Sequence, residues 1–164
     1  MKKMLGITFF VCILFTIVGC SSQGQNDNAF EEAVIQERIE AGVDGVNIID
    51  LVENENDGVA FYTTYKGSED NVTSPSLAYF EKIDNKWERG MGTTCEKEWQ
   101  VLGTTNALYC GAVPDGFDHI IVNGEEASVF EIHEKLSSWY LITDGPEYAI
   151  KAVAENGYEQ YIKD

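Results

Sequence analysis

The sequence has little positive charge. Eleven lysines and arginines stand against 28 aspartates and glutamates, which gives a formal net charge of −17 at pH 7. A chain this acidic repels phosphate backbones and anionic lipid headgroups, so we expect neither nucleic-acid binding nor docking of the protein surface itself on a negatively charged membrane. Cationic partners are compatible with this charge, and so is a solvated surface that only keeps the protein soluble.

Histidines are scarce, which limits the metal sites that the chain can build. Glu131 and His133 alternate, so they share one face of an expected strand, and His119 is the other histidine. A zinc site normally needs three or four ligands of this kind. We therefore interpret these residues as partly exposed side chains at strand ends and predict no metal site.

A calcium loop is also poorly supported. Glu53, Glu55 and Asp57, followed by Gly58, resemble the start of an EF-hand loop, but Thr64 stands where that loop needs its bidentate glutamate. A solvated hairpin turn explains the segment without an ion. No cofactor is predicted from any pattern in the chain.

Catalytic patterns are missing as well. Ser137 and Ser138 follow His133 closely, but no Gly-x-Ser-x-Gly elbow and no phosphate-binding glycine loop occur. With 28 acidic residues, any two could be paired as hydrolytic carboxylates, so their number supports no particular pair. We expect a non-enzymatic protein, with a small carboxylate-dependent hydrolase as the alternative.

What the sequence does contain begins at its N-terminus. Lys2 and Lys3 precede an apolar run, Leu5–Val18, of 14 residues. A bilayer-spanning helix needs about 20 such residues, whereas a basic start, a short apolar run and small residues after it are typical of a signal peptide. Residues 1–19 are therefore predicted to be a signal peptide.

The end of this run, Ile17-Val18-Gly19-Cys20, resembles the lipobox of bacterial lipoproteins, with isoleucine where that family most often has leucine. The resemblance implies cleavage between Gly19 and Cys20 and a thioether-linked diacylglycerol on Cys20. Two long acyl chains, at about 0.8 kcal/mol per buried methylene, would hold the protein stably on the extracytoplasmic face of the cell membrane.

The rest of the chain divides into a tether and one domain. Residues 20–28 are polar after Cys20, and such a segment reaches on the order of 15 Å. Residues 29–164 are long enough for one β-rich domain with its own core. Without residues 1–19 the chain has nine basic and 28 acidic residues, a net charge of −19.

Two cysteines remain in the expected domain. Cys12 lies in the signal peptide and Cys20 in the lipobox, so Cys95 and Cys110, fifteen positions apart, form an even pair in an oxidising compartment. We predict a disulfide between them, worth about 3 kcal/mol in the chain-entropy account. Two buried thiols or half of a metal site are the alternatives.

One helix is expected, over Ala29–Ala41. Asn28 and Glu31 have the spacing of a capping box, and Gly42 supplies a stop. Beyond it, β-branched and aromatic segments alternate with turn signals such as Asn123-Gly124 and Asn156-Gly157. The expected strands are Val46–Val52, Val59–Tyr65, Leu77–Ile83, Trp87–Met91, Leu108–Val113, His119–Val122, Ala127–Ile132, Trp139–Thr143, Tyr148–Ala154 and Tyr158–Ile162.

This spacing predicts a mainly β fold with one short N-terminal helix, an antiparallel meander or β-sandwich of about nine to ten strands. Adjacent aromatic residues in strands, such as Phe61-Tyr62, Tyr79-Phe80 and Trp139-Tyr140, must point to opposite faces. A core on both sides of a sheet is the favoured interpretation, and an exposed aromatic face for peptide, glycan or protein contact is the other.

The layout resembles small, largely uncharacterised lipoproteins of Gram-positive bacteria. The features that carry the resemblance are the lipobox, the polar tether, the short helix and hairpin segments such as Phe80–Trp87 and Val122–Ala127. It implies no particular activity. We therefore expect a lipid-anchored envelope protein that binds a cationic or wall-associated protein or peptide, with an acidic spacer as a further alternative.

Overall fold

The computed structural model describes residues 28–68, 70–97, 100–102, 106–133, 136–144 and 149–163. These residues form one helix and twelve strands. The predicted signal peptide and most of the tether, including Cys12, Gly19 and Cys20, lie outside the described residues, as do Trp99 and Tyr148. The elements are α1 Ala29–Glu40, β1 Gly45–Glu53, β2 Asp57–Tyr65, β3 Ser76–Ile83, β4 Lys86–Thr94, β5 Gln100–Leu102, β6 Asn106–Ala112, β7 His119–Val122, β8 Glu125–Glu126, β9 Ser128–His133, β10 Leu136–Asp144, β11 Ile150–Val153 and β12 Glu159–Lys163.

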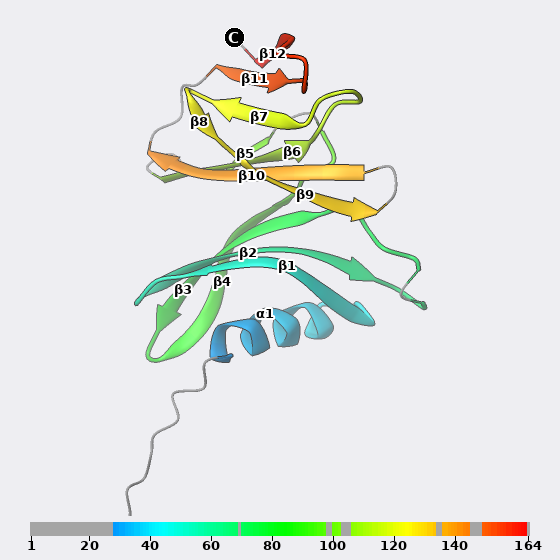
Figure 1. The fold of residues 1–164 in the computed structure, drawn as a ribbon. Helices are drawn as coiled ribbons and strands as arrows, with labels where there is room; N and C mark the ends of the chain where they lie inside the picture. Colours follow the sequence, from blue (N-terminus) through cyan, green and yellow to red (C-terminus); the bar gives the residue numbers. More distant parts are fainter. Residues whose placement is uncertain are drawn as a thin grey trace, which may run out of the picture.

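The strands form three antiparallel sheets of four strands each. Sheet A has the order β1-β2-β3-β4, sheet B the order β5-β6-β10-β9, and sheet C the order β12-β11-β7-β8. Figure 1 shows them as successive layers, with α1 covering the outer face of sheet A and sheet C at the opposite end. The predicted β-rich antiparallel fold is confirmed.

The structure has two strands more than the ten expected from the sequence, and both are short. Where the sequence predicts one strand, Ala127–Ile132, the chain forms two strands, β8 and β9, with Ala127 between them. Strand β8 pairs with β7 in sheet C, and β9 pairs with β10 in sheet B. The buried Ala127 still donates its backbone N–H to Ile120 O, and the chain then crosses to the next layer. Strand β5 spans only three residues, too few for an alternating pattern to reveal it.

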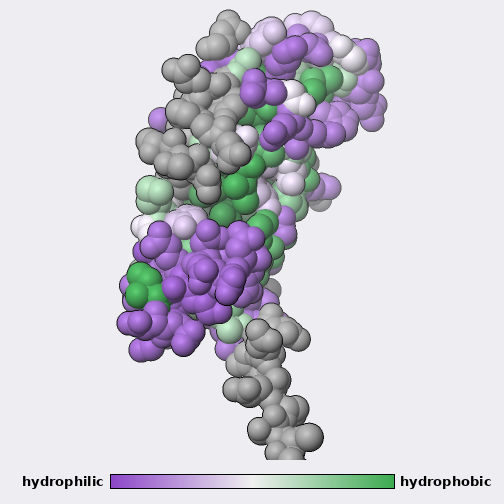
Figure 2. Space-filling model, turned by 90° about the vertical axis from the view of Figure 1, so that its left-hand side faces the viewer, coloured by the Kyte–Doolittle hydropathy of each residue, from purple (hydrophilic) through white to green (hydrophobic). Residues whose placement is uncertain are grey.

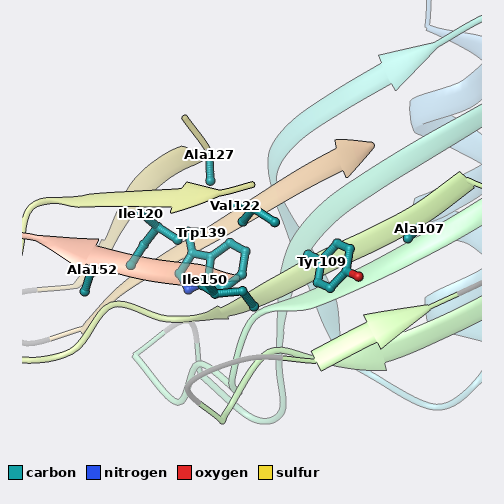
Figure 3. Close-up of a cluster of buried hydrophobic side chains, with 8 residues drawn as sticks. All are labelled: Ala107, Tyr109, Ile120, Val122, Ala127, Trp139, Ile150 and Ala152. Atoms are coloured by element: carbon teal, nitrogen blue, oxygen red, sulfur yellow. The ribbon is translucent and has the colours of Figure 1, made fainter. Parts of the chain in front are cut away.

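Each pair of layers encloses its own apolar core. Between α1 and sheet A lie Phe30, Val34, Ala60, Tyr62, Ala78 and Phe80. Between sheets A and B lie Val59, Phe61, Leu77, Cys95, Leu108, Cys110 and Tyr140. Between sheets B and C lie the eight side chains drawn in Figure 3, where Trp139 lies beside Ile120 and Ile150.

Adjacent aromatic residues explain how one strand serves two cores. Trp139 and Tyr140 are neighbours on β10, yet Trp139 packs toward sheet C and Tyr140 toward sheet A. Phe61 and Tyr62 divide in the same way between the faces of β2. The prediction of a two-sided core is confirmed for these pairs, because successive side chains of a strand point to opposite faces and both faces are covered.

Turn chemistry fixes the hairpins. Asn123 and Gly124 have φ values of 50° and 88°, the left-handed conformation of a type I′ turn, as expected. Asp84 and Asn85 adopt the same conformation between β3 and β4, with φ values of 50° and 62°. In the β11–β12 hairpin only Gly157 has positive φ, and its N–H donates to Ala154 O at 2.8 Å.

The helix is confirmed, but its N-terminus differs from the prediction. No side-chain hydrogen bond from Asn28 caps α1, because the φ of −117° and ψ of 9° at Asn28 differ from the extended conformation that a capping box requires. The stop is as expected. Gly42 takes a φ of 92°, and the N–H groups of Gly42 and Val43 donate to carbonyls of the last turn, Ile39 and Arg38.

Cys95 and Cys110 form the predicted disulfide, with their Cα atoms 5.5 Å apart. Cys95 directly follows β4 of sheet A, and Cys110 lies on β6 of sheet B. Both are buried in the core between these sheets. The bond therefore joins two layers of the stack.

Gly58 permits the close approach of α1 to sheet A, which yields a prediction. A Cβ atom at Gly58 would lie 2.6 Å from the ring of Phe30, and that ring is already packed 4.6 Å from Trp87 and 5.5 Å from Phe80 between centroids. Because this buried ring is packed against both neighbouring rings, Gly58→Ala should lower the free energy of unfolding by about 1–3 kcal/mol. Chemical denaturation of both proteins measures this difference.

Gly90 provides the matched control for Gly58. It lies on the edge strand β4, and the nearest atom to a Cβ there is 3.3 Å away, on the side chain of Tyr79. We expect Gly90→Ala to change stability clearly less than Gly58→Ala. Equal losses from the two variants would contradict the proposed role of Gly58.

Candidate functional site

A hollow of about 170 Å³ opens at one end of sheet B, beside the connection to sheet C. Its walls come from the turn that follows β6 and from the facing ends of β9 and β10. The described residues that line it are Val113, Pro114, Asp115, Gly116, Phe117, Glu131, His133, Leu136 and Ser137.

The strand register brings the polar side chains together. Ser137 on β10 is directly opposite Glu131 on β9, so both side chains point to the same face of sheet B. Trp139 follows Ser137 by two positions and lies in the core between sheets B and C. The hollow therefore lies on the face of sheet B that packs against sheet C, at an end that sheet C does not cover. Glu131 and His133, expected to share a face, do line one site.

Backbone hydrogen bonds hold the turn in place against β10. Val113 donates its N–H to Ser137 O at 2.9 Å, and Phe117 donates its N–H to Pro114 O at 3.2 Å. Gly116 takes a φ of 85°, which side chains other than hydrogen rarely allow. Val113 and Phe117 also pack against the core between sheets B and C, so the wall is fixed on two sides.

The exposed groups of the hollow are mainly polar. Asp115, Glu131 and His133 are exposed, and Ser137 is half-buried. Within the described ranges, no hydrogen bond joins the Ser137 hydroxyl to the His133 ring, and no group of three metal-ligating side chains is found. The arrangement offers two carboxylates, an imidazole and a hydroxyl to a polar ligand.

The second histidine lies elsewhere. His119 is on β7, and its Nδ1 lies 2.8 Å from Glu126 Oε1. The outer face of sheet C also holds Lys151, which lies 2.9 Å from Glu159 Oε2 and 5.0 Å from the centroid of the Tyr161 ring. The hydrogen bond to Glu159 raises the pKa of Lys151. On this face Lys151 and Glu159 therefore form an ion pair.

Sequence reasoning missed one polar contact in the core between sheets A and B. Tyr140 donates its hydroxyl to Asp50 Oδ2 at 2.6 Å, although the residues are 90 positions apart. A bulge in β1 makes Ile48 pair with Tyr62 but Asp50 with Phe61, which turns Asp50 toward sheet B. Burial, followed by the hydrogen bond and the charge of Asp50, raises the pKa of Tyr140.

The acidic segment Glu53–Gly58, which resembles the start of an EF-hand loop, forms a hairpin turn. Glu53 pairs with Gly58 at the end of the β1–β2 ladder. Asn54 donates its N–H to Asp57 O and its side-chain amide to Asp57 Oδ1, at 2.8 and 2.7 Å. The turn is held by these bonds, so the predicted hairpin turn is confirmed.

The surface reflects the layered architecture. On the side seen in Figure 2, hydrophilic residues dominate both the end formed by α1 and sheet A and the end formed by sheet C, and apolar residues appear between them. Among the described residues no helix combines the length and apolar character needed to cross a bilayer.

Comparisons with protein-family models, with curated proteins and with solved structures found no match to this chain. A functional proposal therefore rests on the residues and the geometry of this chain alone.

Proposed function

We propose that this protein is a lipoprotein of the bacterial envelope, anchored by lipid on Cys20, whose β domain binds a partner and catalyses no reaction. The observation that carries the anchor is the sequence Ile17-Val18-Gly19-Cys20 directly after a short apolar run with a basic start. The predicted disulfide, seen between Cys95 and Cys110, fits an oxidising compartment outside the cytoplasm.

The arrangement of the layers supports a binding role for the end farthest from the anchor. The described chain enters the fold at α1, beside sheet A, and sheet C lies at the other end of the stack (Figure 1). Packed sheets are about 10 Å apart, so sheet C lies about 20 Å beyond sheet A. A lipid near α1 would leave sheet C and the hollow beside it directed away from the membrane.

Binding is favoured over catalysis by the state of the polar groups in the hollow. Asp115 and Glu131 are exposed to water, and in the described structure the serine and histidine there are not hydrogen-bonded to each other. Nucleophilic catalysis needs a base within hydrogen-bond reach of the nucleophile, whereas recognition needs only accessible polar groups.

The anchor is tested by replacing Cys20. In a bacterial host supplied with a labelled fatty acid, we expect the wild-type protein to carry label and to sediment with membranes. Cys20→Ala should lose the label completely, because the thioether cannot form. Cys12→Ala should keep it, since Cys12 lies within the apolar run and is not expected to carry lipid.

The matched pair of cysteine variants makes the result decisive. Label that persists in Cys20→Ala would reject the proposed anchor, as would equal loss of label from both variants. A protein that carries no label in its wild-type form would reject it too.

A carboxylate-dependent hydrolase is the second candidate, because Asp115 and Glu131 both line the hollow. A hydrolase would convert a bound ligand to products, while a binding protein would return it unchanged. Recovery of the intact ligand by mass spectrometry after prolonged incubation with the protein separates the two functions.

A further inference from the structure

We infer that Asn123 is a site of spontaneous covalent modification, at which the asparagine loses its side-chain amide and the β7–β8 turn gains a carboxylate. This inference is independent of the lipid anchor and of the binding function proposed above. It begins from the two Asn-Gly sequences of the chain, Asn123-Gly124 and Asn156-Gly157, which the fold places in turns of different construction.

The reaction is an attack of the chain on itself. The backbone nitrogen of the residue after asparagine forms a bond to the side-chain carbon Cγ, and the side-chain amide leaves as ammonia with the proton of the attacking N–H. Water then opens the cyclic imide at either carbonyl, which yields aspartate or isoaspartate, and no oxidant or reductant takes part. Glycine as the next residue favours the attack, because it has no Cβ atom to obstruct the approach of its nitrogen.

In the β7–β8 turn the attacking nitrogen is free. Asn123 and Gly124 are exposed and have φ values of 50° and 88°, as the two central residues of a type I′ turn do. Pairing of Val122 with Glu125 closes the hairpin around them. Within the described ranges, neither the N–H of Gly124 nor the side chain of Asn123 forms a hydrogen bond.

In the β11–β12 turn the same two groups are engaged. The N–H of Gly157 donates to Ala154 O at 2.8 Å, so the nitrogen that would attack is held in a hydrogen bond. The side-chain oxygen of Asn156 accepts the backbone N–H of Tyr158 at 2.9 Å, which fixes the side chain in place. Both hydrogen bonds have to break before an attack at Asn156. The fold therefore protects Asn156 and leaves Asn123 open to reaction.

Asn85 is a third exposed turn asparagine and shows what the following residue contributes. It has a φ of 62° in the β3–β4 turn. The next residue, Lys86, carries a Cβ atom beside its nitrogen and pairs with Ile83 at the end of the β3–β4 ladder. We therefore expect Asn85 to stay intact while Asn123 reacts.

The product changes the turn in two ways. The new carboxylate lies next to Glu125 and Glu126 in the sequence, so it adds negative charge to an acidic segment. The isoaspartate form also adds a methylene to the backbone of a turn that has only two residues. Strand β8 consists of Glu125 and Glu126 alone, and the buried Ala127 after it donates its N–H to Ile120 O. The protein should thus become more acidic with time and lose order where the chain leaves sheet C.

The test is peptide mapping by mass spectrometry of the protein purified from its bacterial host and incubated at physiological temperature and neutral pH. We expect deamidation at Asn123 to be about tenfold faster than at Asn156, a difference of about 1.4 kcal/mol in activation free energy. The control is the reduced chain in denaturant, where the protecting hydrogen bonds are absent and the two rates should be similar.

Variants assign the acidic form to one residue. Asn123→Gly places Gly-Gly in the turn, a pair that type I′ turns accept, and should abolish the early acidic band in isoelectric focusing. Asn85→Gly is the matched control, because it replaces another exposed turn asparagine of positive φ. It should leave the acidic band unchanged.

Four results would overturn the inference: no deamidation at Asn123, equal rates at Asn123 and Asn156 in the folded protein, a tenfold ratio that persists in denaturant, or an acidic band that remains in Asn123→Gly. None of them involves Cys20 or a bound partner. A failure at Asn123 is therefore distinguishable from a failure of the lipid anchor, which fatty-acid labelling tests separately.

Discussion

Replacing Trp139 by alanine should lower the free energy of unfolding by about 3–5 kcal/mol, the usual cost of removing a large aromatic side chain from a core. Trp139 is fully buried on β10, where it packs with Ile120 and Ile150 between sheets B and C. A domain of this size is stabilised by about 5–15 kcal/mol, so the loss is a large share of the total.

The effect should come from packing. Among the described residues the indole Nε1 of Trp139 has no hydrogen-bond partner, so alanine leaves a cavity but removes no hydrogen bond. Trp139→Phe keeps an aromatic ring in the core and should cost clearly less. Guanidinium denaturation followed by far-ultraviolet circular dichroism measures all three proteins.

Tyr161 gives the surface control for Trp139. It lies on β12 in sheet C, and 53% of its surface is exposed. Tyr161→Ala should change stability by less than about 1 kcal/mol. If Trp139→Ala is as mild as Tyr161→Ala, sheet C does not pack on sheet B in the manner described.

Removing the disulfide should have the second largest effect. The double variant Cys95→Ala, Cys110→Ala opens a loop of 15 positions, and the chain-entropy account assigns about 3 kcal/mol to its closure. The cysteines are 1% and 0% exposed, so alanine also leaves small voids in the core between sheets A and B. The loss in the free energy of unfolding should therefore reach about 3–4 kcal/mol.

Burial of the disulfide adds a kinetic expectation. Because a thiolate must reach a sulfur atom to break the bond, a mild reductant should act slowly on the folded protein and quickly in denaturant. Free-thiol titration over time follows the reaction. Two reactive thiols in the denatured, unreduced mature chain would contradict the disulfide altogether.

The sequence predicts which residues form strands better than it predicts how the sheets are built. β-branched and aromatic content identifies β2 and β10, and the two-residue period of a strand assigns Trp139 and Tyr140 to opposite faces. It cannot say which sheet covers each face, because that depends on pairing between segments distant in the chain. The segment around Ala127 is an example, because the strands on either side of this residue, β8 and β9, belong to two different sheets.

The candidate site was predictable only in part. Glu131 and His133 share a face because they alternate on one strand, and the sequence predicts this directly. The pairing of Ser137 with Glu131 needs the register of β9 and β10, and the position of Asp115 needs the turn to fold back on β10. The contact of Asp50 with Tyr140 depends on a bulge, for which the sequence gives no signal.

The presence of Asp115 among the residues that line the hollow also has a local explanation. Asp115 belongs to a sequence with a strong turn signal, Pro114-Asp115-Gly116, where aspartate is common for conformational reasons alone. That it lines the same hollow as Glu131 emerges only from the folded structure. A local explanation and a functional one can therefore hold for the same residue.

The most direct test of the lipoprotein proposal is the mass of the N-terminal peptide of the protein purified from bacterial membranes. We predict a chain that begins at Cys20 and carries the added mass of a thioether-linked diacylglycerol. A chain that retains Met1–Gly19, or that is cut elsewhere and leaves Cys20 with an unmodified thiol, would contradict the account.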